Sequence, residues 1–485
     1  MKKHILYFTT LILLTTAGCR KIEMDGEKEI IIINGGGNST TGQTITLQGR
    51  INADTLLKKE NTYILKGLVY MVGNHTMTIQ AGTVIKGAFA GSDVAALVIT
   101  RGSKISAQGT SDQPIIFTSA SPNPQSGDWG GIIICGKAGI NTSYLGTPGL
   151  YQVEGGVDNS FGDGLAGSGD AVAPTVIDAD NSGLLSYVRI EYAGYAFQPD
   201  KEINSLTMAA VGSGTVINHI QIVYAKDDAY EWFGGSVNCK YLISYKTQDD
   251  DFDTDNGYNG KVQFGLVLRD SLIADISKSE AFESDNNSSG STGLPKTNAV
   301  FSNITAIGPK ALLNNVGNSL FLAGAHIRRN SSISLFNSVI MGWPDGILID
   351  ASTGTPADLN INDSSLRIRY TTITGCTNAI KYKASTATPT GATDASILAW
   401  FTNPFFGNTI LTNNSDAKLI QPYNYSAFDP TPFAGSSGYQ PIVAGANFSD
   451  AKLVGSFFTV VNFRGAIAPA GIESNWWKGW TKFNY

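Results

Sequence analysis

The sequence predicts an all-β protein folded as a right-handed parallel β-helix, a solenoid with loop insertions and an aromatic cap at its carboxyl end. Three observations predict this fold. One acidic pattern occurs three times, short apolar runs alternate with Gly, Asn and Asp from Tyr63 onward, and no segment of the body has the periodicity of a long helix. A solenoid grows in one dimension, so the 485 residues are expected to form one long domain rather than two or three.

The acidic pattern reads DDAYE from Asp227, DDDFD from Asp249 and EAFE from Glu280. Matched residues lie 22 (250 − 228) and 30 (280 − 250) positions apart. Repeats of this length bury their apolar face only against neighbouring copies, so equivalent residues should stack on adjacent strands about 4.8 Å apart.

Stacking gives each residue of the pattern a predicted direction. Tyr230, Phe252 and Phe282 should form an aromatic ladder in the core. Because side chains alternate along a strand, Glu231, Asp253 and Glu283 should point outward.

The rest of the body has the composition of short strands and tight turns. The whole chain contains 54 Gly, and only 15% of its residues are charged. Hairpin signals are sparse, which favours closed coils over a meander. Two stretches without apolar periodicity are expected to be insertions, a projecting loop at residues 149–180 and a second loop at residues 384–393.

The amino-terminal end has the pattern of an export signal, with Lys2 and Lys3 before an apolar run. Residues 1–18 are the predicted signal peptide. The sequence TAGC at residues 16–19 resembles the lipobox of bacterial lipoproteins, and the resemblance implies that Cys19 is lipidated and anchors the chain in a membrane. An ordinary signal peptide or a short anchor is the alternative. Residues 19–45 are then a tether, residues 46–455 the β-helix and residues 456–485 the cap.

Further motifs carry a family resemblance. The sequences AGTVIKG and LVITRGSKISAQGTSDQPIIFTS resemble the opening coils of bacterial surface β-helix proteins. GDWGGIIICGKA, SGLLSYVRIEYAG, DDAYEWFGG and DDDFDTDNG resemble an uncharacterised family of β-helix lipoproteins of Gram-negative bacteria, with a pectate-lyase-like superfold. The resemblance implies a location at the outer membrane, on the cell surface, and brings no known reaction.

Carboxylates stacked this closely repel one another, so either their pKa values rise or a cation lies between them. Calcium, which takes six to eight oxygen ligands, is the natural candidate. The alternative is that these acids sit at coil corners and accept hydrogen bonds from their own backbone. The predicted metal ligands are Asp228, Glu231, Asp250, Asp251, Asp253, Glu280 and Glu283.

An acidic ladder on a β-helix resembles calcium-dependent polysaccharide lyases, which also need a basic residue near the metal. Lys261, Arg328 and Arg329 are the candidate bases, although the two arginines are also explained as charge compensation. Hydrolysis by a carboxylate pair is a further alternative. The chain lacks the Gly-His-Gly and Arg-x-Lys segments of aspartate-rich β-helix hydrolases.

The favoured interpretation is a surface lipoprotein that presents an acidic, calcium-binding face to a glycan or protein partner, and a lyase acting on uronate glycans is the alternative. A net charge of −6 argues against a nucleic-acid partner. His75, His219 and His326 are far apart in the sequence, so no histidine site is predicted, and His219 is expected to be structural. Aromatic residues crowd the predicted cap, namely Phe457, Phe458, Phe463, Trp476, Trp477, Trp480 and Phe483.

Overall fold

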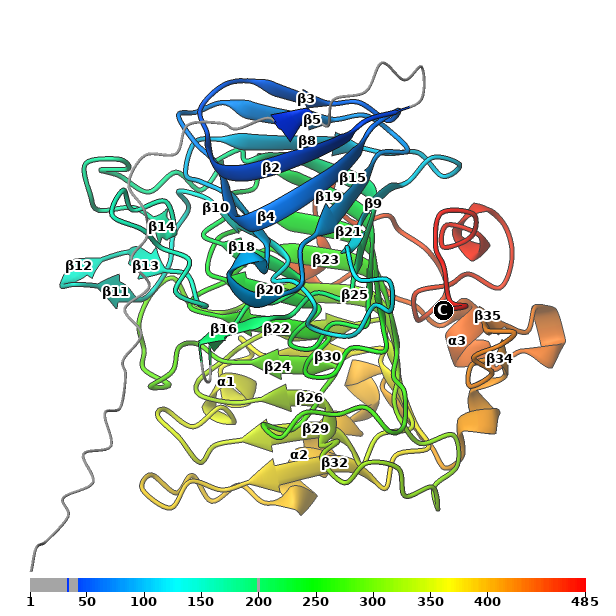
Figure 1. The fold of residues 1–485 in the computed structure, drawn as a ribbon. Helices are drawn as coiled ribbons and strands as arrows, with labels where there is room; N and C mark the ends of the chain where they lie inside the picture. The colour runs from blue at the N-terminus through cyan, green and yellow to red at the C-terminus, as the bar shows by residue number, and fades with distance from the viewer. Residues whose placement is uncertain (1–32, 35–41, 199–200) are drawn as a thin grey trace, which may run out of the picture.

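The protein is a parallel β-helix with three strand ladders around one apolar interior (Figure 1). This computed structural model describes residues 33–34, 42–198 and 201–485. The predicted fold class is confirmed. The predicted signal peptide, Cys19 and most of the tether lie outside the described residues, and the first long strand begins at Thr44.

Ladder A carries the acidic pattern. It begins with the second half of β2 (Thr44–Ile51), continues with the second half of β4 (Thr62–Met71), and each later strand pairs in parallel with the one before it. Its further strands are β7 (Ala96–Ile99), β10 (Ile132–Cys135), β18 (Leu206–Ala209), β20 (Tyr230–Phe233), β22 (Phe252–Asp255), β24 (Phe282–Ser284), β26 (Ala323–Ile327), β29 (Asp345–Asp350) and β32 (Asn378–Lys383).

Ladders B and C share long strands that bend in the middle. In the central coils one strand gives its first half to ladder B and its second half to ladder C; these strands are β15 (Gly183–Glu191), β19 (Val216–Val223), β21 (Asn238–Tyr245), β23 (Lys261–Leu268) and β25 (Val300–Ile307). Ladder B also contains β3 (Thr55–Leu57), β5 (Thr76–Ile79), β8 (Lys104–Gln108), β27 (Ser334–Phe336) and β30 (Arg367–Arg369). Ladder C also contains the first halves of β2 and β4, then β6 (Val84–Gly87), β9 (Ile115–Ser119), β28 (Val339–Met341), β31 (Thr372–Thr374) and β33 (Thr409–Leu411).

The bend in these strands is a residue in the left-handed conformation. Tyr187, His219, Tyr241 and Phe264 have φ of 52°, 52°, 59° and 63°, at equivalent places in four successive coils. Their rings form an outer stack, with centroids 4.2, 4.4 and 5.1 Å apart. His219 is therefore a packed ring of the outer stack, and burial lowers the pKa of its imidazole to about 4.

The remaining elements are short and lie outside the ladders. β1 (Ile33–Asn34) pairs with β2 in antiparallel fashion, and the small hairpins are β11 (Ser143–Tyr144) with β12 (Thr147–Pro148), β13 (Leu150–Gln152) with β14 (Leu165–Gly167), β16 (Ala196–Gln198) with β17 (Lys201–Glu202) and β34 (Leu419–Gln421) with β35 (Asp429–Pro432). The α-helices are α1 (Leu359–Asn362), α2 (Asp394–Phe401) and α3 (Gln440–Ala444). None of the helices among the described residues has the length and apolar character that a membrane crossing requires.

The first predicted insertion folds back on the body instead of projecting from it. Its β13 and β14 form a hairpin, and Val153 and Val157 are buried against the outer face of ladder A. Ion pairs join its Asp163 to Arg50 and its Asp170 to Arg101. The few apolar residues of the insertion therefore pack on the outer face of ladder A, a contact that the sequence pattern did not indicate.

The aromatic carboxyl segment covers a flank of the β-helix rather than its open end. Trp476, Trp477 and Trp480 pack with the outward side chains of ladder C and with the outer stack. Figure 1 places the chain's carboxyl end beside the stack of strands. The open end is covered by α2, whose Ile397 and Phe401 are buried in the interior cluster. The outer aromatic stack needs a cover of its own, and the carboxyl segment provides it.

Candidate functional site

The three acidic copies stack in the predicted register. Tyr230 pairs with Phe252 and Phe252 with Phe282, with ring centroids 5.6 and 5.3 Å apart in the interior. On the outer side, Glu231, Asp253, Glu283 and His326 follow one another on β20, β22, β24 and β26. We call these four residues the acidic column, and it places ionisable side chains on neighbouring strands of ladder A.

A second row of polar residues runs beside the acidic column at the corner that precedes each strand. Asn204, Asp228 and Asp250 each accept a hydrogen bond from the backbone N–H of the equivalent residue one coil further, at 3.2, 2.9 and 2.6 Å. The last of these N–H groups belongs to Glu280. One oxygen of each aspartate is therefore structural, but its donor is the backbone of the next coil and not the residue's own corner, as the Asx-turn alternative expected. The side chain still borders the cavity.

These residues border a cavity of about 370 Å³, which we call the acidic cavity. Its wall also contains groups that the sequence did not assign to a site: Glu154 from the first insertion, Glu202 from β17, and Lys278. The full lining is Glu154, Glu202, Asn204, Asp227, Asp228, Glu231, Asp249, Asp250, Asp253, Ser277, Lys278, Glu283 and Arg328. The sequence could have indicated Asp227 and Asp249 as site residues, because each directly precedes a predicted metal ligand in the acidic repeat.

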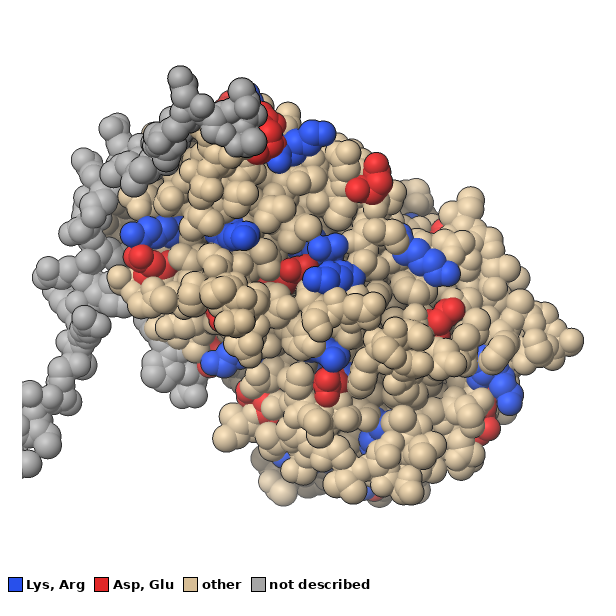
Figure 2. Space-filling view, turned by 45° about the vertical axis from the view of Figure 1, so that its right-hand side comes forward, with Lys and Arg blue, Asp and Glu red and all other residues tan. Residues whose placement is uncertain are grey.

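Acidic residues gather in this cavity. The face in Figure 2 is largely uncharged, with scattered acidic and basic side chains. A concentration of carboxylates in one cavity is therefore a local feature of ladder A, and it needs a local explanation.

Burial raises the pKa of the cavity carboxyls well above the usual range, and the charges of their neighbours raise it further. This holds for Asp228, Glu231, Asp250 and Asp253. Burial also raises the pKa of Glu283 to about 7, although the Arg328 guanidinium opposes the shift. A site of this kind is occupied either by protons or by a cation near neutral pH.

The donor set fits calcium. The carboxylate oxygens of Asp227, Asp228 and Asp249 lie within 4.8 Å of one another, and so do those of Asp228, Glu231 and Asp253. Oxygens around calcium lie at 2.3–2.6 Å from the ion, so any two of them are at most about 5 Å apart. Oδ1 of Asp249 and Oδ1 of Asp253 are buried and have no hydrogen-bond partner among the described residues. These five residues could hold the ion.

Asp251 does not reach the cavity. It is fully buried, and its Oδ1 lies 3.3 Å from Nη1 of the equally buried Arg269. Ser244 donates a second hydrogen bond to the same carboxylate. The chain turns at this corner and directs Asp251 into the interior, so its prediction as a metal ligand was wrong.

The three candidate bases are placed differently from one another. Lys261 lies at the start of β23, outside ladder A, and its Nζ is 5.7 Å from the ring centroid of Phe458. Arg328 borders the acidic cavity and pairs with Glu283 and with Asp285, the latter at 2.8 Å. Arg329 pairs with Asp285 at 2.6 Å. The structure thus brings Arg328 to the site as a charge partner and leaves Lys261 away from it.

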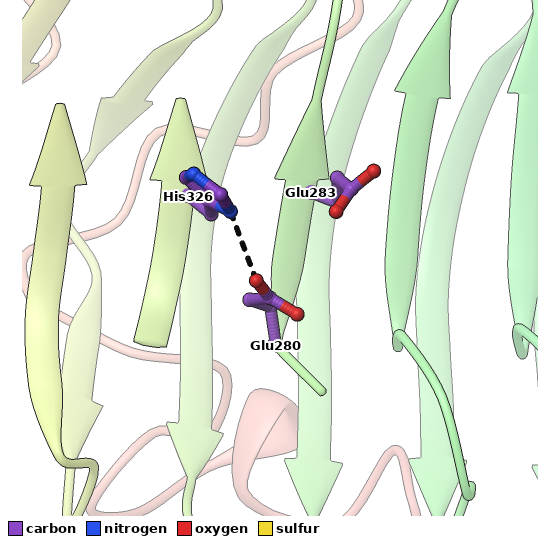
Figure 3. Close-up of side chains that lie close together, drawn as sticks. All are labelled: Glu280, Glu283 and His326. Atoms are coloured by element: carbon purple, nitrogen blue, oxygen red, sulfur yellow. Dashed lines mark hydrogen bonds and ion pairs between the residues drawn. The ribbon is translucent and has the colours of Figure 1, made fainter. Parts of the chain in front are cut away.

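His326 is the functional-site residue that sequence reasoning missed. Its Nδ1 lies 2.9 Å from Oε1 of Glu280 (Figure 3). Its Nε2 lies 3.2 Å from Oδ2 of Asp350. A lone histidine 43 residues (326 − 283) after the last acidic copy gives no motif. Only the pairing of β24 with β26 brings it into the acidic column.

Comparison with known families gives one match, and it covers most of the body. Residues 49–404 match the model of the pectate-lyase like beta helix domain, a span that contains every residue of the acidic cavity. Searches of curated proteins and of solved structures found no match. The match exceeds half of the 485 residues and agrees with the three parallel ladders. The chain therefore belongs to the pectate-lyase like β-helix domain family.

Proposed function

We propose that this protein is a binding module that holds calcium in its acidic cavity and, through the ion, an acidic glycan. The observation that carries the proposal is the set Asp228, Glu231 and Asp253, whose oxygens lie within 4.8 Å of one another. Oδ1 of Asp253 is buried without a hydrogen-bond donor among the described residues. A buried carboxylate oxygen with no donor is stabilised by a cation, and the all-oxygen donor set favours calcium.

The glycan follows from the charge of the cavity. Without a cation the carboxylates would repel any acidic ligand, whereas a bound calcium ion reverses the local charge and offers coordination positions to a uronate. Lys278 is exposed at the edge of the cavity and can donate hydrogen bonds to the same ligand. The family match, to a pectate-lyase like domain, supports a glycan over a protein partner.

The proposed location is the cell surface of a Gram-negative bacterium. The resemblance of residues 16–19 to a lipobox supports lipid attachment at Cys19 and an anchor in the outer membrane. Labelling with a radioactive fatty acid would test this, because Cys19→Ala should remove the label and Cys135→Ala, a buried body cysteine, should retain it.

The calcium site is tested by thermal melting of the mature protein in chelator and in millimolar calcium. We expect calcium to raise the melting temperature by several degrees, because it binds only the folded state. Asp253→Asn should lose the rise, and Asp93→Asn, an exposed acid on another part of the chain, should keep it. No rise in the unmodified protein would contradict the proposal.

The glycan is tested with polygalacturonate and alginate, and with uncharged dextran as the control. Binding to the two uronate polymers should require calcium and should weaken in Lys278→Met, while dextran should not bind. If calcium binds but neither uronate polymer does, the calcium site is supported and the proposed glycan partner is wrong.

A lyase is the second candidate, favoured by one observation. Lys278 borders the cavity and makes no salt bridge with any described residue, so it is the candidate base, which in its neutral form would take a carbon-bound proton from a uronate. Calcium, when bound, would neutralise the uronate carboxylate. Incubation with polygalacturonate would then release unsaturated ends that absorb ultraviolet light, and Lys278→Met would abolish the signal while calcium still raised the melting temperature.

A further inference from the structure

The end of the acidic column formed by β24 and β26 differs from the rest because it contains a nitrogen ligand. Nδ1 of His326 and carboxylate oxygens of Glu280 and Glu283 all lie within 4.8 Å of one another (Figure 3). We propose that these three residues form a second metal site, which takes a zinc-class transition metal rather than calcium. The site shares no residue with the calcium set Asp228, Glu231 and Asp253. The zinc site can therefore be correct whether or not calcium binds in the acidic cavity.

The orientation of the His326 ring is fixed from behind by Asp350. Asp350 accepts hydrogen bonds from Nζ of Lys383 at 2.9 Å and from the backbone N–H of Ser352 at 2.8 Å. These donors hold Asp350 as an ionised acceptor, so Nε2 of His326 must carry the proton that it donates to Asp350 at 3.2 Å. Metal-bound histidines are oriented in the same way, by a carboxylate on the other ring nitrogen.

With Nε2 protonated, Nδ1 of His326 faces a carboxylate. It lies 2.9 Å from Oε1 of Glu280, and two acceptors at that distance require either a proton or a metal ion between them. A proton gives an imidazolium with two carboxylate partners. A metal ion leaves the imidazole neutral and binds both atoms.

Glu280 provides the independent observation that favours the metal. Its side chain is only 1% exposed, and its second oxygen, Oε2, has no hydrogen-bond partner among the described residues. Figure 3 shows the two oxygens of Glu280 apart, one joined to His326 and the other turned away from it. A proton on His326 satisfies only the first oxygen and leaves the second buried without a donor, whereas a metal ion would balance the charge of the whole carboxylate.

The donor set selects the class of metal. One imidazole nitrogen with two carboxylates is a ligand set for zinc and similar ions, whereas calcium takes oxygen ligands. Tetrahedral zinc ligands at 2.0–2.1 Å lie about 3.3 Å from one another. The 2.9 Å between Nδ1 of His326 and Oε1 of Glu280 is close to that separation, so a small outward movement would admit the ion.

The proposed ion would have an open position toward the acidic cavity. Glu283 borders that cavity, and Arg328 already occupies its Oε1, so the other oxygen of Glu283 would bind the ion. Three protein ligands leave the fourth zinc position for water or for a group of the glycan. The ion would then contact ligands that enter the cavity.

The test is calorimetric titration of the chelator-stripped mature protein with zinc. We expect one equivalent to bind, with an affinity at least about 100-fold lower in His326→Gln and in Glu280→Gln, and about 10- to 100-fold lower in Asp350→Asn. His75→Gln is the matched control, because His75 also faces a carboxylate, Asp54 at 3.2 Å, but lies exposed on a distant coil. It should bind zinc as the unmodified protein does.

Cobalt provides a second readout that does not depend on the stability of the variants. Cobalt(II) bound to the unmodified protein should show visible absorption bands, and zinc should remove them. Absence of zinc binding, or zinc binding that survives in His326→Gln but is lost in Asp253→Asn, would overturn the proposal. His326 would then be an imidazolium that only balances charge.

Discussion

Phe252→Ala tests the stacked register most directly. Phe252 is fully buried, and its ring centroid lies 5.6 Å from Tyr230, 5.3 Å from Phe282, 6.2 Å from Trp232 and 6.1 Å from Phe301. Truncation of a buried phenylalanine costs about 3–5 kcal/mol in total, and this total includes its aromatic pairs, each worth about 0.5–1.5 kcal/mol beyond the buried area. With four such neighbours we expect the upper end of the range, about 4–5 kcal/mol of unfolding free energy.

One neighbour of Phe252 cannot fill the space that the ring would leave. Gly265 lies against the ring, since a Cβ built there would be 3.1 Å from Cζ of Phe252, and glycine has no side chain to move inward. Urea unfolding followed by circular dichroism measures the loss. Phe405→Ala is the control, because Phe405 is 72% exposed and should cost less than about 1 kcal/mol. Equal losses in the two variants would refute the stacked interior.

Three further predictions follow from burial and charge. In chelator, the melting temperature should fall as the pH rises from about 5 to 8. Burial raises the pKa of Asp255 to about 8 and of Glu283 to about 7, so the folded state releases these protons at higher pH than the unfolded chain does. Calcium should suppress the fall, and a melting temperature in chelator that does not change with pH would contradict this prediction. Arg269→Met should cost about 3–5 kcal/mol in urea unfolding because it leaves Asp251 charged and buried, and Asp251→Leu added to it should restore part of the loss. Trp480→Ala, on the flank, should lower the unfolding free energy by about 3–5 kcal/mol and increase the binding of a hydrophobic dye. An unchanged dye signal would mean that the flank stays covered.

The register of ladder A could be predicted because the acidic pattern occurs three times in the sequence. Each copy combines a large inward aromatic residue with an outward acid, as in Phe252 and Asp253, and alternation along a strand then fixes both faces. Asp251 shows where this reasoning ends. It lies at the corner before the strand, where the backbone turns and alternation no longer determines the direction of a side chain.

The parts that could not be predicted depend on contacts between distant segments. Glu154 reaches the acidic cavity from the first insertion, and His326 reaches the acidic column only through strand pairing. The place of Trp480 depends on the outer stack, whose rings are turned away from the interior by a left-handed bend and packed under the carboxyl segment. A bend of this kind in a residue other than glycine has no sequence signature strong enough to predict it.

The hydrogen bonds from each coil to the aspartate of the preceding coil have a consequence for how the site can change. The step between Asp228 and Asp250 takes 22 residues (250 − 228) and the step between Asp250 and Glu280 takes 30 (280 − 250), yet both are closed by the same kind of bond. The additional residues are absorbed by the connection that carries Lys278, outside the ladders. The rim of the cavity can therefore be lengthened or exchanged without moving the stacked carboxylates, so that the affinity of the proposed metal site and the selectivity for the proposed glycan could vary separately.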